Sequence, residues 1–366
     1  MNEKPSIVLA GGGTAGHINP MLAIAREIRK LSPDARILTV GTENSMEARM
    51  VPEAGYEITF IPRVPFPRRP NKEAIFFLGK FWESVKKAQK ILTDAQADVV
   101  VGVGGYVCTP VYLAARKLNI PVVIHEANAK PGLANKVGAT KATFVGTAFP
   151  ATPIKNAHYV GMPMREAIEK LDRRRERPAA RERLGLNPSL PTVVVTGGSL
   201  GALSLNTAMI DIYQRLEEWG FQLLHITGRD KALKDSQGEL LAAQNYQQRE
   251  FITSMEDVYA AADLMVVRSG AATVSEVAAV GVPAIFVPLP IGNGEQALNA
   301  QSLIDAHAGI LINDSDFNAA WFTNNVPSLM NDSQRLQEMA ERSSQQGIRN
   351  AAYLMAQEIL KVVQHD

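Results

Sequence analysis

The chain has 366 residues, more than one hydrophobic core usually supports, so its length predicts two domains of ordinary size. Hydrophobic residues make up 46% and charged residues 20%, a composition that excludes a disordered tail and a membrane-embedded bundle. The net charge of +1 is uneven: residues 1–155 hold 20 Lys and Arg against 12 Asp and Glu, and the remainder holds 18 against 25.

The basic N-terminal half indicates an anionic partner such as a membrane surface or pyrophosphate, with chance surface composition as an equal alternative. No secretion signal is expected, because residues 1–5 lead directly into a short strand. The longest uncharged stretches, 99–115 and 277–294, are broken by Gly and Pro, so no transmembrane helix is expected. The single cysteine, Cys108, cannot form an internal disulfide, which fits a reducing cytoplasm.

Short β-type runs alternate with helical patterns, which is typical of parallel α/β domains. In the first half, strands are expected over 6–10, 35–40, 99–103 and 122–124, and helices over 20–31, 45–53 and 110–118. The Arg- and Glu-rich residues 164–184 predict a solvated helical connector. Strands then follow over 192–196, 222–227, 248–252, 264–268 and 284–288, with helices from about Ser204 and over 274–280.

This repetition predicts two Rossmann-like, doubly wound α/β domains that face a cleft. The first is expected over residues 1–163 and the second over residues 164–345. A last amphipathic helix, at about 346–366, is expected to pack back on the first domain.

The first strand runs into Gly11-Gly12-Gly13-Thr14-Ala15-Gly16-His17, where amides at a helix start converge on an anion. The glycines match G-x-G-x-x-G, but the acidic residue expected of a dinucleotide site about 20 residues on is missing, since Glu43 comes later. A tight turn without a ligand is the alternative. His17 is the candidate general base, because a helix N-terminus disfavours imidazolium; the alternative is a ring that only orients the loop.

Polar residues also follow later strands. His125-Glu126-Ala127-Asn128 lies at the carboxyl edge of the first sheet, where Asn128 is suited to a sugar hydroxyl and His125 and Glu126 to fixing the loop. A second glycine turn, residues 197–201 with Ser199, repeats the anion-binding arrangement. Two such turns favour a transferase that joins a nucleotide sugar to a phosphate-bearing acceptor.

The segment from Arg268 to Glu276 predicts a strand end, a small-residue turn and a helix start with one carboxylate. Glu276, expected on the first helical turn, is suited to a ribose, with N-terminal capping as the alternative. Gln296 is a candidate for recognising the sugar, and Arg165 is a candidate for stabilising a departing diphosphate. Asp314-Ser315-Asp316 resembles a D-x-D metal motif, but Asp and Ser before a helical pattern are ordinary capping residues, so no metal site is expected.

Six apolar residues fall on one helical stripe with lysines on the other side, which predicts an interfacial helix on anionic lipid. A helix that packs on the core with a solvated lysine face is the alternative. The stripe consists of Ile75, Phe77, Leu78, Phe81, Trp82 and Val85.

In their order and spacing, residues 11–17, 125–128, 197–202, 269–276 and 296–300 resemble the MurG family of UDP-GlcNAc transferases, over nearly the whole chain. The resemblance implies a GT-B glycosyltransferase fold and an inverting transfer of GlcNAc from UDP-GlcNAc to the 4-hydroxyl of MurNAc in lipid I, which makes lipid II for bacterial peptidoglycan. It implies no cofactor and no nucleic acid, and a peripheral location on the cytoplasmic face of the plasma membrane. Cell-wall synthesis and division proteins are further candidate partners.

The same resemblance assigns site residues. Those implied for the donor are Thr14, Ala15, Gly16, Asn128, Arg165, Ser199, Ile252, Ala271, Ala272, Thr273, Val274, Ser275, Glu276 and Gln296. Those implied for the acceptor pyrophosphate are Gly13, His17, Gly104, Gly105 and Tyr106, and the membrane patch is the stripe named above. Two departures are Ala15, where the family often has Gly, and Glu295, where it often has Gln or His.

Three alternative functions remain at this point. A UDP-GlcNAc 2-epimerase shares the architecture but needs acid/base carboxylates and no lipid acceptor. An NAD(P)-dependent dehydrogenase is less favoured by the two glycine turns. A non-catalytic UDP-sugar-binding module would bind the donor without transferring it.

Overall fold

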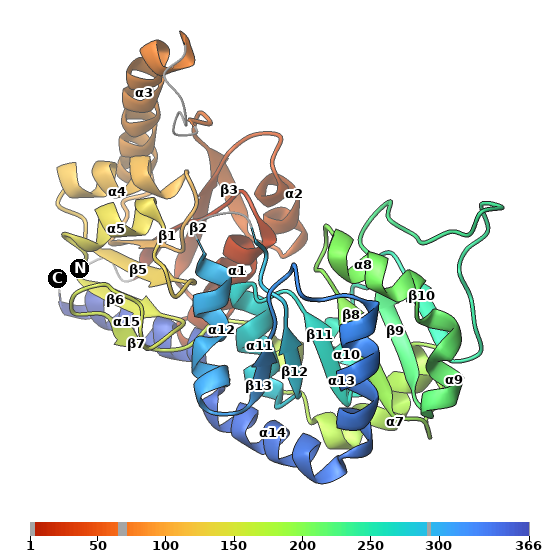
Figure 1. The fold of residues 1–366 in the computed structure, drawn as a ribbon. Coiled ribbons are helices and arrows are strands. Elements are labelled where there is room, and N and C mark those ends of the chain that lie inside the picture. Colours follow the sequence, from red (N-terminus) through yellow and green to blue (C-terminus); the bar gives the residue numbers. More distant parts are fainter. Residues whose placement is uncertain (1–3, 65–71, 291–293, 366) are drawn as a thin grey trace. The chain divides into compact units, whose positions relative to one another are not determined.

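The computed structural model describes residues 4–64, 72–290 and 294–365. It divides the chain into two compact units, the first comprising Met1–Arg165 with Arg349–Asp366 and the second Glu166–Ile348. Each unit is built on a parallel β-sheet with helices against it (Figure 1).

The sheet of the first unit has seven parallel strands in the order β3-β2-β1-β4-β5-β6-β7. The strands are β1 (Ser6–Ala10), β2 (Arg36–Gly41), β3 (Glu57–Phe60), β4 (Val99–Gly102), β5 (Val122–Glu126), β6 (Phe144–Thr147) and β7 (His158–Tyr159). Strand β1 is central and places Val8 between Leu38 of β2 and Val100 of β4. The strand order reverses between β1 and β4, so the loops after these two strands border the switch point where open α/β sheets bind ligands.

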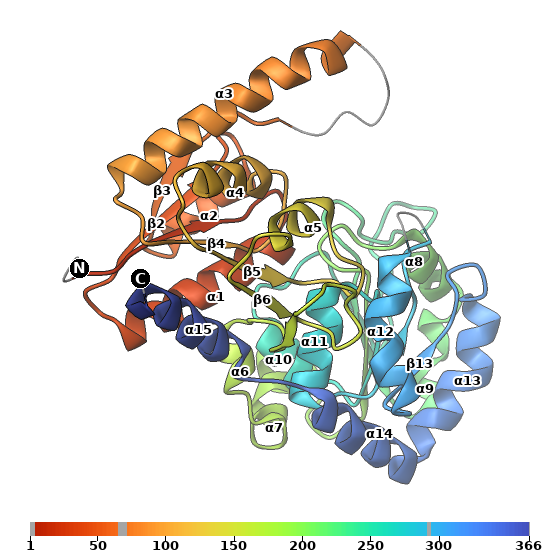
Figure 2. The same cartoon turned by 90° about the vertical axis from the view of Figure 1, so that its left-hand side faces the viewer.

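The helices of this unit are α1 (Ala15–Leu31), α2 (Met46–Glu53), α3 (Lys72–Asp94), α4 (Cys108–Lys117), α5 (Leu133–Ala139) and α15 (Ala351–His365). Alternate residues of β1 face two different cores, which explains its continuous apolar run. Ile7 and Leu9 pack in one cluster with α1 and α15, while Val8 and Ala10 pack in another with α3 and α4. Figure 2 shows α15 alongside α1.

The second unit repeats the plan with six parallel strands in the order β10-β9-β8-β11-β12-β13. They are β8 (Thr192–Thr196), β9 (Gln222–Ile226), β10 (Tyr246–Arg249), β11 (Leu264–Val267), β12 (Ala284–Phe286) and β13 (Gly309–Leu311). Its helices are α6 (Glu166–Glu169), α7 (Arg173–Arg183), α8 (Leu203–Ile210), a 3₁₀ turn (Tyr213–Arg215), α9 (Leu216–Trp219), α10 (Met255–Ala261), α11 (Ala271–Val280), α12 (Glu295–Asp305), α13 (Ala319–Asn331) and α14 (Ser333–Gln346). The strand order reverses between β8 and β11, which predicts a second ligand edge.

Two expectations about helices need correction. Helix α1 begins at Ala15, so His17 lies at a helix start as expected, but the helix extends the pattern expected over 20–31 by five residues. Pro20 is tolerated because it lies in the second turn and removes only one helical hydrogen bond. The segment expected to be a solvated connector forms α6 and α7, and Arg181 of α7 is buried. Its guanidinium forms an ion pair with Asp263, so one face of this charge-rich helix packs against the rest of the unit instead of facing solvent.

Candidate active site

The first glycine turn is closed by a carboxylate from helix α2. Glu47 is fully buried, and its Oε2 accepts a hydrogen bond from the N–H of Gly13 at 3.0 Å. Its Oε1 accepts from the N–H and the hydroxyl of Thr42. The N–H of Gly13 is therefore already used. No sequence pattern indicated Glu47, because its contact with the turn forms only in the folded chain.

The amides that remain for an anion are those at the start of α1. Thr14 is the residue before the helix, and its side chain makes no capping hydrogen bond to the described residues. The first N–H groups of a helix have no partner within the helix. The amides of Ala15 and Gly16 are thus open to an anion, as expected of this turn, whereas the amide of Gly13 is not.

The loop after β4 lies directly on the first turn, as expected from the switch point. A Cβ atom on Gly105 would lie 2.5 Å from the Gly12 carbonyl oxygen, so only glycine fits at this φ of +91°. The Tyr106 hydroxyl lies 3.0 Å from the Thr42 hydroxyl, and the Arg63 guanidinium lies over the Tyr106 ring. The structure therefore brings together all the residues implied for the acceptor.

His17 is the third residue of α1 and is held by its Nδ1 atom. Nδ1 lies 3.2 Å from the Gly12 carbonyl oxygen and 3.3 Å from the Thr14 hydroxyl. Because a carbonyl can only accept, the neutral ring bonded to Gly12 carries its proton on Nδ1 and leaves a lone pair on Nε2. Burial lowers the pKa of His17 against the opposing charges of Glu126 and Glu47, so the neutral form is favoured.

The polar loop after β5 is braced internally. Glu126 accepts from the amides of Asn128 and Gly132 and from the Asn135 side chain. His125 is fully buried, its Nε2 lies 2.8 Å from the Gly161 carbonyl, and burial lowers its pKa to about 4. Both residues fix the loop, as expected, and leave Asn128 half-buried at its surface.

In the second unit, the turn after β8 is also held by backbone contacts. The N–H of Gly198 donates to the Thr196 hydroxyl, and a Cβ on Gly201 would lie 2.0 Å from the Thr227 carbonyl oxygen. Ser199 is exposed at the tip of this turn. Helix α8 follows, and Ala202 before it cannot cap it, so its first amides are available to an anion.

Glu276 lies elsewhere on its helix than expected. Helix α11 begins at Ala271, so Glu276 is its sixth residue and the first turn holds no acidic residue. The expectation of a first-turn carboxylate is wrong, and the capping alternative fails with it. Glu276 Oε2 instead accepts a 2.7 Å hydrogen bond from the Tyr259 hydroxyl of α10, a contact that no sequence pattern indicated.

The start of α11 is left open for a ligand. Gly270 precedes it without a side-chain cap among the described residues, so the amides of Ala271 to Thr273 face outward from the carboxyl end of β11. Glu276 lies one turn further along the same helix. A phosphate at the amides and a sugar hydroxyl at the carboxylate are therefore compatible with one ligand.

A partly buried arginine ties the surrounding loops together. Arg268 forms an ion pair with Asp314, and it donates to the Ser204 hydroxyl and to the carbonyl oxygens of Val287 and Pro288. Helix α13 is capped by Asn318, so the expectation that Asp314 is a capping residue is wrong. Its proximity to Arg268 was not evident from the sequence.

The remaining predicted site residues are scattered along loop ends. Gln296 is the second residue of α12, and its Oε1 accepts from the N–H of Leu289 at 3.0 Å. Ile252 follows β10, which spans Tyr246–Arg249, whereas the sequence predicts a strand over 248–252. Arg165 is the last residue of the first unit before α6.

The apolar stripe of α3 divides into two parts. Val85 is fully buried in the core with Ala88 and Leu92, so its predicted contact with lipid is wrong and the core-packing alternative holds there. Leu78 and Trp82 are 63% and 46% exposed, whereas Phe81 is partly buried against the core and Phe77 stacks on Phe81. The side chain of Ile75 lies outside the described residues. In the part of the chain that the structure describes, no helix has the length and apolarity needed to cross a bilayer.

Comparisons with known proteins show which family the chain matches. The N-terminal domain of glycosyltransferase family 28 matches residues 7–147 and the C-terminal domain of that family matches residues 192–355. The chain is 55% identical, over 99% of its length and 97% of the relative, to the UDP-N-acetylglucosamine--N-acetylmuramyl-(pentapeptide) pyrophosphoryl-undecaprenol N-acetylglucosamine transferase of Paenarthrobacter aurescens. The protein of the same name from Streptomyces coelicolor is 45% identical over 95% of the chain and 96% of its own length.

Solved structures agree on the fold. The crystal structure of Acinetobacter baumannii MurG matches with a TM-score of 0.77 and 30% identity over 98% of this chain and 99% of that one. A UDP-GlcNAc 2-epimerase from Neisseria meningitidis matches with a TM-score of 0.68 but only 14% identity, which shows the shared fold alone. The predicted GT-B fold is confirmed.

Proposed function

We propose a function from one premise: this chain belongs to glycosyltransferase family 28, among the MurG-type N-acetylglucosamine transferases. It transfers GlcNAc from UDP-GlcNAc to lipid I, the undecaprenyl-pyrophosphate-linked MurNAc-pentapeptide, and forms lipid II for peptidoglycan synthesis. The observation that carries this conclusion is the 55% identity over 97% of the length of a relative so named.

The donor is proposed to bind mainly to the second unit. Ser199 and the uncapped starts of α8 and α11 supply hydroxyl and amide donors for the diphosphate. Glu276 accepts hydrogen bonds from the ribose hydroxyls, the backbone at Ile252 binds uracil, and Gln296 binds the sugar. The donor residues proposed in the first unit are Thr14, Ala15, Gly16, Asn128 and Arg165.

The acceptor pyrophosphate is proposed to bind to the first unit. Gly104 and Gly105, in the loop after β4, place backbone amides beside His17 and the first glycine turn. Arg63, stacked over Tyr106, adds a positive charge to the same surface. This arrangement suits a pyrophosphate whose attached sugar presents its 4-hydroxyl to His17.

The reaction is proposed to be a single inverting displacement. The 4-hydroxyl oxygen of MurNAc attacks the anomeric carbon of GlcNAc while the bond from that carbon to the UDP oxygen breaks. Nε2 of His17 accepts the hydroxyl proton, since Nδ1 is held by Gly12. Arg165 and the helix-start amides stabilise the charge that develops on UDP.

The protein is proposed to work as a peripheral protein on the cytoplasmic face of the plasma membrane. Lipid I is anchored in the bilayer, so the first unit must reach the membrane surface. Leu78 and Trp82 of α3 are the exposed apolar side chains proposed to contact it, beside a lysine-rich helix surface. Anionic lipid and proteins of cell-wall synthesis or division are the proposed further partners.

The decisive experiment is a transfer assay with radiolabelled UDP-GlcNAc and purified lipid I. Formation of labelled lipid II, abolished when lipid I is omitted, is the expected result. Conversion of UDP-GlcNAc to its 2-epimer without acceptor would instead establish the epimerase. Donor binding without any lipid product would leave only a UDP-sugar-binding module.

A further inference from the structure

A cavity of about 420 Å³ lies in the second unit, away from the residues proposed for the donor. Its lining includes residues that directly precede strands: Pro191 before β8, Asp263 before β11 and Pro283 before β12. The proposed donor residues follow the strands of the same sheet. The cavity is therefore at the opposite edge of the sheet, where the reaction has no use for it.

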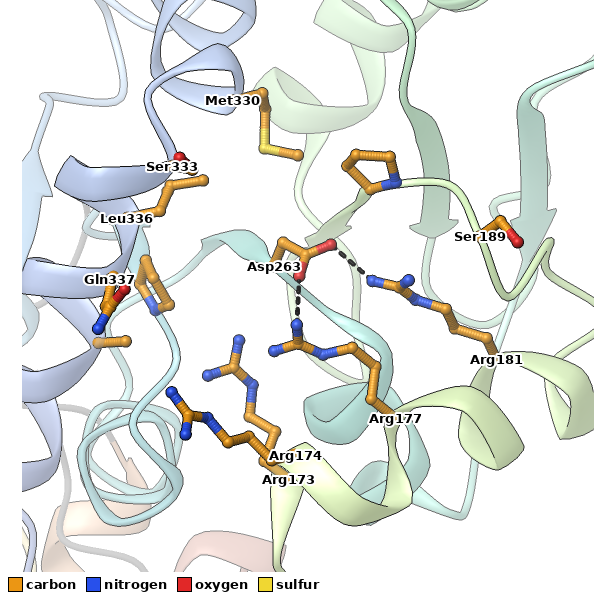
Figure 3. A pocket seen from close by; sticks show the side chains of 13 residues that line it. Arg173, Arg174, Arg177, Arg181, Ser189, Asp263, Met330, Ser333, Leu336 and Gln337 are labelled. Carbon is orange, nitrogen blue, oxygen red and sulfur yellow. Dashed lines mark hydrogen bonds and ion pairs between the residues drawn. The ribbon is translucent and has the colours of Figure 1, made fainter.

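Four arginines of helix α7 line this cavity. Arg174, Arg177 and Arg181 are spaced three and four residues apart, so they fall on one face of the helix, and Arg173 adjoins them. Figure 3 shows these side chains reaching from the helix toward Asp263 and the space beside it.

The charges around the cavity are not balanced. Asp263 is the one acidic residue among the described lining residues, and its two oxygens pair with Arg177 at 2.9 Å and Arg181 at 2.6 Å. Among the described residues, Arg173 donates only to the carbonyl oxygens of Ala262 and Gly281. Four guanidinium groups thus meet one carboxylate.

Two donors in the cluster have nothing to bind. The Nε atoms of Arg173 and Arg177 are buried without a hydrogen-bond partner among the described residues. Burial, followed by repulsion from Arg177, lowers the pKa of Arg173 to about 9. Buried positive charge is costly unless it is paired, so an anion in this cavity would compensate the excess positive charge of the cluster.

We propose that this cavity binds a small phosphate ester. The planar guanidinium groups of α7 suit the phosphoryl oxygens, which accept paired hydrogen bonds from arginine. The wall facing α7 includes the apolar side chains of Met330, Leu336 and Pro283, which accommodate the carbon skeleton of the ester, together with the polar Ser333 and Gln337.

A purely structural role accounts for only part of the cluster. Each of the three guanidinium nitrogens of Arg181 donates a hydrogen bond, to Ala261, Pro188 and Asp263, so this residue fixes α7 to the segments before β8 and β11. Arg174 is exposed and has no ion pair or hydrogen bond to the described residues, so stability gives no reason for its place at the cavity. A substitution of Arg174 therefore tests anion binding without removing a contact that stabilises the fold.

The test is a calorimetric titration of the full chain with phenyl phosphate, in excess UDP so that any donor phosphate site is occupied. Saturable binding is expected, and Arg174→Gln is expected to weaken it about tenfold, as for loss of a charged hydrogen bond. The matched control is Arg175→Gln on the same helix. Arg175 is 80% exposed, approaches Glu176 and does not line the cavity, so binding should be unchanged.

Thermal unfolding of both variants shows whether each has kept its fold. Vesicles with and without phosphatidic acid, added as competitors, distinguish a lipid phosphoryl group from a soluble ester: displacement by the acidic vesicles alone assigns the lipid source. The proposal is overturned if the wild-type chain binds no phenyl phosphate, or if Arg174→Gln and Arg175→Gln weaken binding equally.

Discussion

The N–H of Gly13 donates to the Glu47 carboxylate at 3.0 Å, across 34 residues of sequence. The same carboxylate would lie 2.5 Å from a Cβ atom at Gly12, so the turn and α2 fit together without space for a side chain. The turn is thus shaped by a buried carboxylate before any ligand arrives. That rigidity holds the start of α1, and with it His17, in a fixed position.

Replacing Glu47 with Gln should destabilise the protein and loosen the acceptor site. The amide keeps the volume but turns one acceptor into a donor beside the Gly13 and Thr42 N–H groups, at a cost of about 1–3 kcal/mol. Urea unfolding measures the stability, and KM for lipid I should rise. The exposed Glu43 provides the control, since Glu43→Gln should change neither quantity.

The effect of Glu47 should also depend on pH. Burial raises the pKa of its carboxyl, but hydrogen bonds, first that from Gly13, outweigh burial and hold the pKa below its ordinary value. The ionised form therefore stabilises the fold above the ordinary pKa, and this contribution is lost as the pH falls through the lowered value. The stability difference between the wild type and Glu47→Gln should shrink in acid; a constant difference would contradict the assignment.

Replacing His17 with Ala should reduce kcat by about 10²–10⁴-fold while leaving the unfolding transition nearly unchanged. Because burial lowers the pKa of His17, the wild type should keep its base form below pH 6.5. Activity should fall only as the pH drops through that lowered value. Near-wild-type turnover of His17→Ala would show that the ring only orients the loop.

The sequence predicted the elements whose signals are local. Apolar runs ending in glycine turns located β1 and β8, and periodicity located most helices. The predictions failed where a distant partner decides the outcome. Asp314 depends on Arg268 and the inward face of α7 on Asp263, and these pairs form only when distant parts of the chain are assembled. Glu276 was misplaced because α11 begins at Ala271, and its contact with Tyr259 forms only when α10 and α11 pack together. Val85 was misassigned because an apolar stripe does not reveal whether protein or lipid covers it.

Two buried histidines should make the protein acid-sensitive. Burial lowers the pKa of His125 to about 4 and that of His225 to about 3, so both are neutral when folded and take up protons on unfolding. Stability is then complete above the ordinary pKa of 6.5 and is lost as the pH falls below it. Between pH 7 and pH 5 each should contribute a loss of about 2 kcal/mol.

Urea unfolding of His225→Gln at the two pH values tests this in the second unit. Gln retains one hydrogen-bonding group toward Asn206 or Tyr246 but has no proton to gain. The variant should be less stable at pH 7 and should show a weaker pH dependence than the wild type. An unchanged pH dependence would mean that His225 does not titrate on unfolding.

Replacing Leu78 and Trp82 together with Ser should weaken binding to anionic vesicles by at least about tenfold, because burial of each large apolar side chain is worth about 1.5–3 kcal/mol. Cosedimentation with vesicles measures the loss, and transfer to a detergent-solubilised acceptor should be nearly unaffected. Leu133→Ser, at another exposed apolar residue of the first unit, should bind vesicles as the wild type does. Equal loss in both proteins would indicate that α3 is not the membrane contact.

Glu276→Gln should lower kcat/KM for UDP-GlcNAc by about 10–100-fold, the usual effect of losing hydrogen bonds to a charged group. Tyr259→Phe should have a smaller effect, because it removes the hydroxyl that holds Oε2 but keeps the carboxylate. A 2′-deoxyribose analogue of the donor separates ribose binding from a structural role. If Glu276 binds the ribose, the Gln substitution should lower kcat/KM much less with the analogue than with UDP-GlcNAc, because the analogue already lacks one hydroxyl contact. If the carboxylate serves only to hold α11 against α10, Glu276→Gln should lower kcat/KM equally with UDP-GlcNAc and with the analogue. It should then also lower the unfolding midpoint by as much as Tyr259→Phe does.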